Sequence, residues 1–163
     1  MKLIYYPNEL LTRAVRDVDL ENPGFDPFEL KAQMVELMLM HKGMGLSANQ
    51  IGLDAKLFVM GTSLLHSSMY INPTVLEYKG IMHNEIEGCL SFPDIYVNIE
   101  RATEIVVHYY DENLEECTVN IEGEPAVRCF LHELDHLLGI TMKDHVSSLK
   151  WNMAKNKAKK LRK

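Results

Sequence analysis

The sequence predicts an α+β fold built as a single compact domain. Its β-rich segments are joined by short connections, as in hairpins, and they surround one segment with the apolar spacing of a buried helix. Helices and strands do not alternate along the chain as they would around a parallel sheet. A length of 163 residues suits one domain with one hydrophobic core.

The first predicted helix begins at Pro27 and runs to about Lys42. Asp26 precedes it as a capping residue, proline suits the first helical position, and Gly43 ends it. One face of this helix is marked by three- and four-residue spacing of Leu30, Met34, Leu37, Met38 and His41. The small residues and two glycines of segment 43–50 (GMGLSANQ) then predict a loop.

Five short strands are predicted after this loop, over residues 56–60, 69–78, 81–87, 104–110 and 114–121. The last two form a hairpin, because only Asp111, Glu112 and Asn113 separate them. A second helix follows Pro125 and ends at Gly139. Its apolar face consists of Val127, Phe130, Leu134 and Leu138.

The chain divides by charge into a body, residues 1–149, and a basic tail, residues 150–163. The body has 10 Lys and Arg against 23 Asp and Glu, whereas the tail has seven Lys and Arg and no acid. Good helix formers and a cap at Ser147 or Ser148 predict that the tail is helical. The body should repel nucleic acid, so no specific DNA partner is expected, while the tail should attract nucleic acid.

The composition, with 47% hydrophobic and 25% charged residues, is that of an ordinary globular protein. No apolar run approaches the about 18 residues that a membrane span requires, and the N-terminus lacks the character of a signal or transit peptide. The three cysteines, Cys89, Cys117 and Cys129, show no disulfide spacing. A reducing, cytoplasmic location follows, in which thiolates are available to bind metal.

Residues 132–136 (HELDH) carry the strongest functional signal. Two histidines four residues apart on a helix share a face and can bind one metal ion. Glu133 between them is suited to proton transfer, so the motif predicts hydrolysis by a metal-activated water. A catalytic site of this kind needs a third protein ligand. Cys89, after a strand and beside a glycine, is the best candidate; Cys129 is close enough in spacing, but a small buried hydrophobe is the simpler interpretation.

Three segments together resemble the signature motifs of the peptide deformylases: 43–50 (GMGLSANQ), 87–91 (EGCLS) and 132–136 (HELDH). They occur in the family's order and at similar spacing, and the resemblance covers almost the whole chain. It implies antiparallel sheets around a central helix that carries the two histidines. It also implies removal of the formyl group from N-formylmethionyl nascent peptides, with release of formate.

By motif position, the resemblance implies that Cys89, His132 and His136 bind the metal and that Glu133 is the acid and base. It implies that Gln50 and the backbone N–H of Leu90 stabilise the oxyanion. The family's native ion is Fe(II), which zinc or nickel can replace. A thiolate and two imidazoles suit several of these metals, so the ligand types do not select one.

Three further acidic or basic residues are candidates for roles around the ligands. Glu87 or Asp135 is expected to accept a hydrogen bond from a ligand histidine and fix its tautomer; the alternative is a structural ion pair with Arg101. For substrate binding, the loop at Gly43, Met44 and Gly45 is expected to lie alongside an extended peptide.

Three residues depart from the family pattern. Ser47 replaces a usual alanine, and Leu131 replaces a usual glutamine. Arg128 stands where the family has an apolar residue that lines the methionine pocket, so the side-chain preference for substrate is open.

In bacterial members a basic C-terminal helix contacts the ribosome, and residues 150–163 are a compositional match. Two alternatives stay open: another HExxH metallopeptidase, and a metal-binding relative that lacks activity.

Overall fold

The computed structural model describes residues 1–161, which form three helices and five strands. The helices are α1 (Pro27–Met40), α2 (Ala126–Leu137) and α3 (Ser148–Leu161). The strands are β1 (Gly45–Ser47), β2 (Leu57–Gly61), β3 (Ser67–Cys89), β4 (Phe92–Tyr110) and β5 (Glu116–Glu122). Short 3-10 helices occupy Glu9–Leu11, Ala48–Ile51 and Met142–His145. This set of elements confirms the predicted α+β class.

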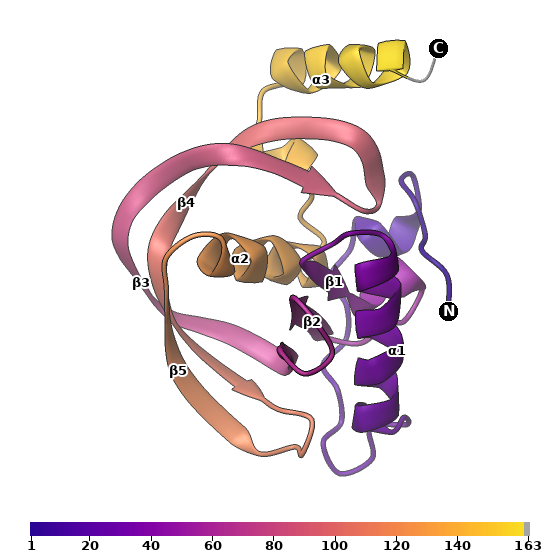
Figure 1. Cartoon of the computed structure of the whole chain (residues 1–163), viewed down its shortest axis with the longest axis vertical. Coiled ribbons are helices and arrows are strands. Elements are labelled where there is room, and N and C mark those ends of the chain that lie inside the picture. The colour runs from indigo at the N-terminus through magenta and orange to yellow at the C-terminus, as the bar shows by residue number, and fades with distance from the viewer. Residues whose placement is uncertain (162–163) are drawn as a thin grey trace.

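The five strands form one antiparallel sheet in the order β1-β2-β3-β4-β5. Figure 1 shows the long ribbons of β3 and β4 curving around α2, with α1 on the other side of the molecule. The helix that carries the HELDH segment is therefore central, as predicted. Because β1 has only β2 as a neighbour, β1 is an edge strand of the sheet.

One face of α2 is anchored in a hydrophobic core. Phe130 is fully buried, and its ring meets Phe58 edge-on at a centroid distance of 5.0 Å. The same cluster contains Tyr70, Ile105, Val107, Val127, Leu131, Leu134 and Leu137. Burial of each large apolar side chain stabilises the fold by about 1.5–3 kcal/mol. This packing fixes the rotation of α2 and hence the direction in which its histidines point.

The strands are longer than the sequence predicts. Residues 69–78 and 81–87 belong to one strand, β3, which carries a register shift between Lys79 and Met82 where Gly80 has a φ of +71°. The sequence predicted two separate strands here. The glycine instead makes a bulge within one strand, and pairing with β4 continues beyond it. The first half of β4, before residue 104, was not predicted as strand; it pairs with the end of β3, from Cys89↔Phe92 to Met82↔Ala102.

The prediction of a loop over residues 43–50 was wrong. Gly45 to Ser47 pair with β2, and the following 3-10 helix is closed by a capping box in which Gln50 accepts a hydrogen bond from the backbone N–H of Ser47 (2.9 Å). The tertiary partner β2 thus gives regular structure to a segment whose small residues suggested none. α1 also ends at Met40, slightly before the predicted end at Lys42.

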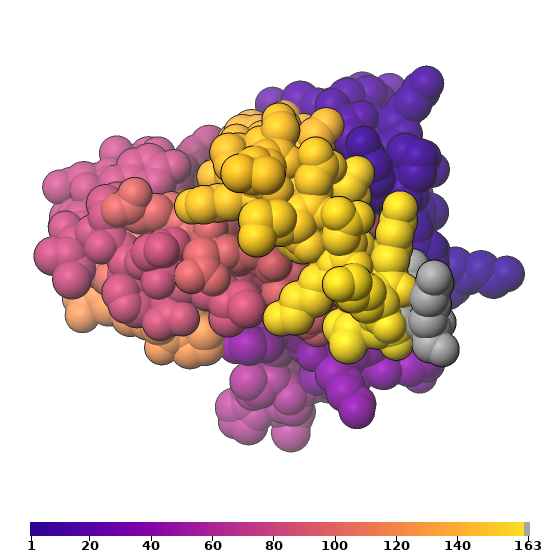
Figure 2. All heavy atoms as spheres, turned by 90° about the horizontal axis from the view of Figure 1, so that it is seen from above, coloured from indigo at the N-terminus to yellow at the C-terminus, as the bar shows by residue number. Residues whose placement is uncertain are grey.

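The basic tail is helical where the structure describes it, and residues 162 and 163 lie outside the described residues. Trp151 is buried and its ring contacts that of Phe92 at 5.8 Å, which attaches α3 to the start of β4. Figure 2 shows α3 lying across the outer surface of the molecule. The lysines of the described tail are all exposed: Lys150, Lys155, Lys157, Lys159 and Lys160. No helix within residues 1–161 is long and apolar enough to cross a membrane.

Candidate active site and metal centre

Helix α2 presents the two motif histidines on one side, with ring centroids 5.0 Å apart. His136 is buried, and burial lowers the pKa of its imidazole, which favours the neutral form with a free lone pair. His132 is held from the other side of its ring, because its Nδ1 lies 2.9 Å from Oε2 of Glu87. The Nε2 atom of His132 is therefore the one available to a metal.

Cys89 reaches the histidines from the end of β3. A tight connection pairs Cys89 with Phe92 and turns the chain into β4 beside α2. The sulfur of Cys89 lies 3.1 Å from Nε2 of His136. One donor atom from each of Cys89, His132 and His136 lies within 4.8 Å of the others. The three residues that the resemblance assigned to the metal are thus adjacent in space.

This donor set fits a catalytic divalent transition metal. One thiolate and two imidazoles are the ligand types that zinc and iron accept, and three protein donors leave a position for water or substrate. Among the described residues, the only cluster of at least three close donors is the one formed by Cys89, His132 and His136. Cys129 lies outside it, and burial, with the nearby charge of Glu133, raises the pKa of its thiol.

Glu133 lines the same cavity as Cys89 and His132. Its carboxyl group is buried, and its Oε2 accepts a hydrogen bond from the hydroxyl of Ser47 at 2.6 Å. Burial raises the pKa of Glu133, and this outweighs the lowering by His132 and by the Ser47 hydrogen bond. A carboxyl group with a raised pKa can both accept and return a proton near neutral pH.

The side chain of Gln50 also lies next to Cys89. Its side-chain nitrogen lies 3.5 Å from the sulfur of Cys89 and 3.2 Å from the hydroxyl oxygen of Ser91. Its side-chain oxygen accepts a hydrogen bond from the Ser47 backbone, so the amide nitrogen faces Cys89 and Ser91. Leu90, next to Cys89, lines the same cavity.

Glu87 and Asp135 are both part of an ion-pair network with Arg101. Glu87 combines the two roles expected for it, since it contacts His132 and forms two hydrogen bonds with Arg101, at 2.7 and 3.0 Å. Burial raises the pKa of Glu87, but the hydrogen bonds from His132 and Arg101 lower it by more, so the carboxyl group is ionised. Asp135 pairs with Arg101 at 2.8 Å and with His145 at 2.7 Å.

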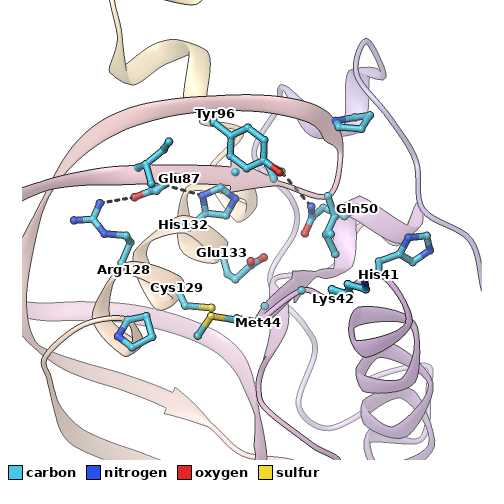
Figure 3. Close-up of a pocket in the computed structure, with 18 of the residues that line it drawn as sticks. His41, Lys42, Met44, Gln50, Glu87, Tyr96, Arg128, Cys129, His132 and Glu133 are labelled. Atoms are coloured by element: carbon cyan, nitrogen blue, oxygen red, sulfur yellow. Dashed lines mark hydrogen bonds and ion pairs between the residues drawn. The ribbon is translucent and has the colours of Figure 1, made fainter. Parts of the chain in front are cut away.

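A cavity of about 630 Å³ opens over the cluster. Figure 3 shows Met44 and Cys129 close together on one side of it, with Gln50 on another and Glu133 between, while His132 lies beside Glu87. The predicted substrate-binding residues Gly43, Met44, Gly45 and Arg128 all line this cavity. Met44 is 44% exposed, so its side chain is accessible to a ligand.

The comparisons with known proteins agree with this geometry. A family model described as "Polypeptide deformylase" matches residues 1–152. The chain belongs to the polypeptide deformylase family. The resemblance predicted from the three motifs is thereby confirmed, and with it the enzyme class, a metal-dependent peptide deformylase.

Relatives match this chain over nearly its whole length. A peptide deformylase of Aquifex aeolicus is 36% identical over 98% of this chain and 95% of its own, and one of Borreliella burgdorferi is 34% identical over 89% and 87%. A peptide deformylase structure from Synechococcus elongatus in complex with actinonin has a TM-score of 0.85 and 31% identity, covering 98% of this chain and 86% of that chain. One from Legionella pneumophila has a TM-score of 0.88 and 29% identity, covering 99% and 94%.

Two residues of the deformylase site were not predicted to act there. Ser47 was treated as a tolerated replacement of alanine, yet its hydroxyl contacts Glu133. Asn49 donates a hydrogen bond to the backbone carbonyl of His136 at 2.6 Å and so ties the first motif to α2. The sequence did offer a signal for these contacts, because Ser47 and Asn49 are polar residues within a segment of small residues. Leu131, the other departure, is buried in the core, where an apolar side chain fits.

We expect Gly45→Ala to lower deformylase activity by about 100-fold, as misplacement of a reacting group by about 1 Å can do. A Cβ at Gly45 would lie 2.5 Å from Oε1 and 2.7 Å from Cγ of Glu133, so the carboxyl group has to move. The measurement is kcat/KM for a formylated tripeptide, with metal content determined in parallel.

Gly43→Ala is the matched comparison for this variant. Its Cβ would meet chiefly the side-chain end of Leu90, at 2.9 Å, and that methyl group can rotate away. A smaller loss is therefore expected at Gly43 than at Gly45. Equal losses in the two variants would mean that crowding of the peptide, and not displacement of Glu133, is responsible.

Proposed function

We propose that this chain removes the N-formyl group from N-formylmethionyl peptides through a metal centre held by Cys89, His132 and His136. The observation that carries the proposal is the adjacency of these three donors to the buried carboxyl group of Glu133. A metal ion bound there supplies a water of lowered pKa and polarises the formyl oxygen.

The protein groups then divide the remaining work. Glu133 accepts a proton from the attacking water and delivers it to the departing amine nitrogen, so that formate and a free amino terminus result. Ser47 holds the carboxyl group of Glu133 in place. The side-chain N–H of Gln50 and the backbone N–H of Leu90 face the developing oxyanion, and one such donor contributes about 3 kcal/mol to transition-state stabilisation.

The peptide itself is proposed to bind along β1. Because β1 is an edge strand, its free side can accept an extended peptide as a further strand. Gly43 and Gly45 leave space for the peptide backbone, while Met44, Cys129 and the methylene groups of Arg128 line the cavity that takes the first side chain. Sulfur and methylene groups suit an unbranched apolar side chain such as methionine.

Formate release from formyl-Met-Ala-Ser tests this function. The peptide product should be intact Met-Ala-Ser, identified by mass, and formate should appear in equal amount. Cleavage within the Met-Ala-Ser backbone would instead identify another HExxH metallopeptidase. Binding of metal without any hydrolysis would indicate a relative that has lost catalysis.

The native ion is proposed to be Fe(II), by analogy with the family, with Zn(II) and Ni(II) as functional replacements. An Fe(II)–thiolate centre is sensitive to oxygen. We expect an anaerobically prepared, iron-loaded enzyme to lose most of its activity in air, while a nickel-loaded sample keeps it. Equal activity of aerobic and anaerobic preparations with the same iron content would contradict the Fe(II) assignment.

The basic tail is proposed to contact the ribosome, and the enzyme to act in the cytoplasm. The exposed lysines of α3 form a cationic surface on a helix that is anchored only through its inner face. We expect deletion of residues 150–163 to weaken salt-sensitive co-sedimentation with ribosomes. Since Trp151 is a core residue, the sharper variant replaces Lys155, Lys157, Lys159 and Lys160 by Gln. Unchanged co-sedimentation with that variant would refute ribosome contact.

A further inference from the structure

Arg128 is a buried arginine in the wall of the cavity, one helical turn before His132 on α2. A guanidinium group has five N–H donors. Nε and Nη2 contact the carboxylate of Glu124, at 3.1 and 2.9 Å, and Nη2 also donates to the carbonyl of His83 at 2.9 Å. Nη1 donates to the carbonyl of Ile99 and to Oε1 of Glu87, both at 2.8 Å. All five donors are therefore used within the protein.

The carboxylate of Glu87 is saturated in the same way. Its Oε1 accepts from Arg101 at 2.7 Å and from Arg128 at 2.8 Å, and its Oε2 accepts from Arg101 at 3.0 Å. The remaining contact of Oε2 is with Nδ1 of His132 at 2.9 Å. A carboxylate offers about four lone-pair directions, so none is left for a different arrangement. Figure 3 shows Arg128, Glu87 and His132 joined in this series.

Arg128 and His132 are related by four residues on α2, and each contacts a different oxygen of the one Glu87 carboxylate. Arg101 approaches the same carboxylate from β4. The carboxylate is therefore fixed relative to α2 by a residue of α2 itself, and relative to the sheet by Arg101. Loss of Arg128 leaves the Glu87 carboxylate held by Arg101 and His132 alone, without its second contact on Oε1.

We propose that Arg128 is a positioning residue for His132: it acts through Glu87, and its charge is not offered to the substrate. This proposal rests on the proposed function, because it takes His132 as a metal ligand. A Glu87 carboxylate surrounded by N–H donors can only accept, so it holds His132 in the tautomer whose Nε2 lone pair faces Cys89 and His136. The cavity meanwhile remains suited to an uncharged side chain, although an arginine lines it.

The test compares zinc-loaded Arg128→Met with zinc-loaded Glu124→Gln. Methionine keeps an apolar wall of similar length but removes the contact with Glu87. Glu124→Gln removes the charged partner of Arg128 and leaves the contact with Glu87 in place. The readout is the rate at which zinc is lost to a chromogenic chelator in the absence of substrate.

We expect Arg128→Met to lose zinc about 10- to 100-fold faster than the unaltered protein, as changes at groups that orient metal ligands do. Glu124→Gln should lose it at nearly the unaltered rate, and Arg128→Lys should fall between. If Arg128→Met does not fold, the double variant with Glu124→Gln, which removes the stranded carboxylate as well, is compared with Glu124→Gln alone.

An unchanged rate of zinc loss in Arg128→Met would overturn the positioning role. Faster turnover of a formyl-Glu peptide than of a formyl-Met peptide by the unaltered enzyme would overturn the claim that the charge of Arg128 is withheld from substrate. Zinc loss is measured without catalysis. A protein that binds zinc but releases no formate therefore contradicts the proposed function alone.

Discussion

Glu133→Ala is expected to lower kcat for formate release by about 1,000-fold, within the range that general acid–base catalysis contributes. The metal donors Cys89, His132 and His136 are untouched by this change, so the metal content should stay the same. Alanine also keeps the helical propensity of α2. The measurement is steady-state kinetics with formyl-Met-Ala-Ser on samples of equal metal content.

The control for this variant is Glu115→Ala, which removes an exposed carboxyl group from the hairpin between β4 and β5. Its kcat should match that of the unaltered enzyme. A Glu133→Ala enzyme that keeps more than about a tenth of the activity would place the proton transfer on another group. Loss of the metal from Glu133→Ala would show that this carboxyl group is a ligand and not the base.

The parts of the fold that the sequence predicted depend on local pattern. Pro27 and Asp26 determine where α1 begins, and the spacing of Phe130 and Leu134 identifies the buried face of α2. The parts that were missed depend on pairing with other strands. Gly80 suggests a break in β3, but pairing with β4 continues across it, and β1 is a strand only because β2 lies beside it.

The same distinction applies to the site. His132 and His136 are paired by helical spacing alone. Cys89 is 43 or more residues away; its position after a strand and beside a glycine made it the best candidate for the third ligand, and the family resemblance supported that choice. The contact of Ser47 with Glu133 spans 86 residues, and that of Arg128 with Glu87 spans 41. A charged residue at position 128 suggested an altered pocket, because only Glu124 is a local partner. The other partners of Arg128 come from β3 and β4.

Removal of the Cys89 thiolate should reduce metal affinity by at least about 100-fold. Apparent binding energies of about 10–16 kcal/mol for four-ligand zinc sites correspond to about 2.5–4 kcal/mol for each ligand. Cys89→Asp supplies a carboxylate at the same backbone position and should recover part of the loss, since zinc and iron both accept oxygen ligands. Dissociation constants from competition with a chelator should therefore increase from the unaltered protein to Cys89→Asp and further to Cys89→Ala.

Cys117→Ala is the matched control, because Cys117 lies on β5 and outside the donor cluster. It should bind metal as the unaltered protein does. If neither change at Cys89 alters metal binding, Cys89 is not a ligand, and only His132 and His136 of the proposed ligand set remain. That result would favour a metallopeptidase with a different third ligand. The metal dissociation constants of the two Cys89 variants give a further distinction. If any ligand atom at this position suffices, Cys89→Asp binds metal more tightly than Cys89→Ala; if sulfur is required, the two variants bind equally weakly.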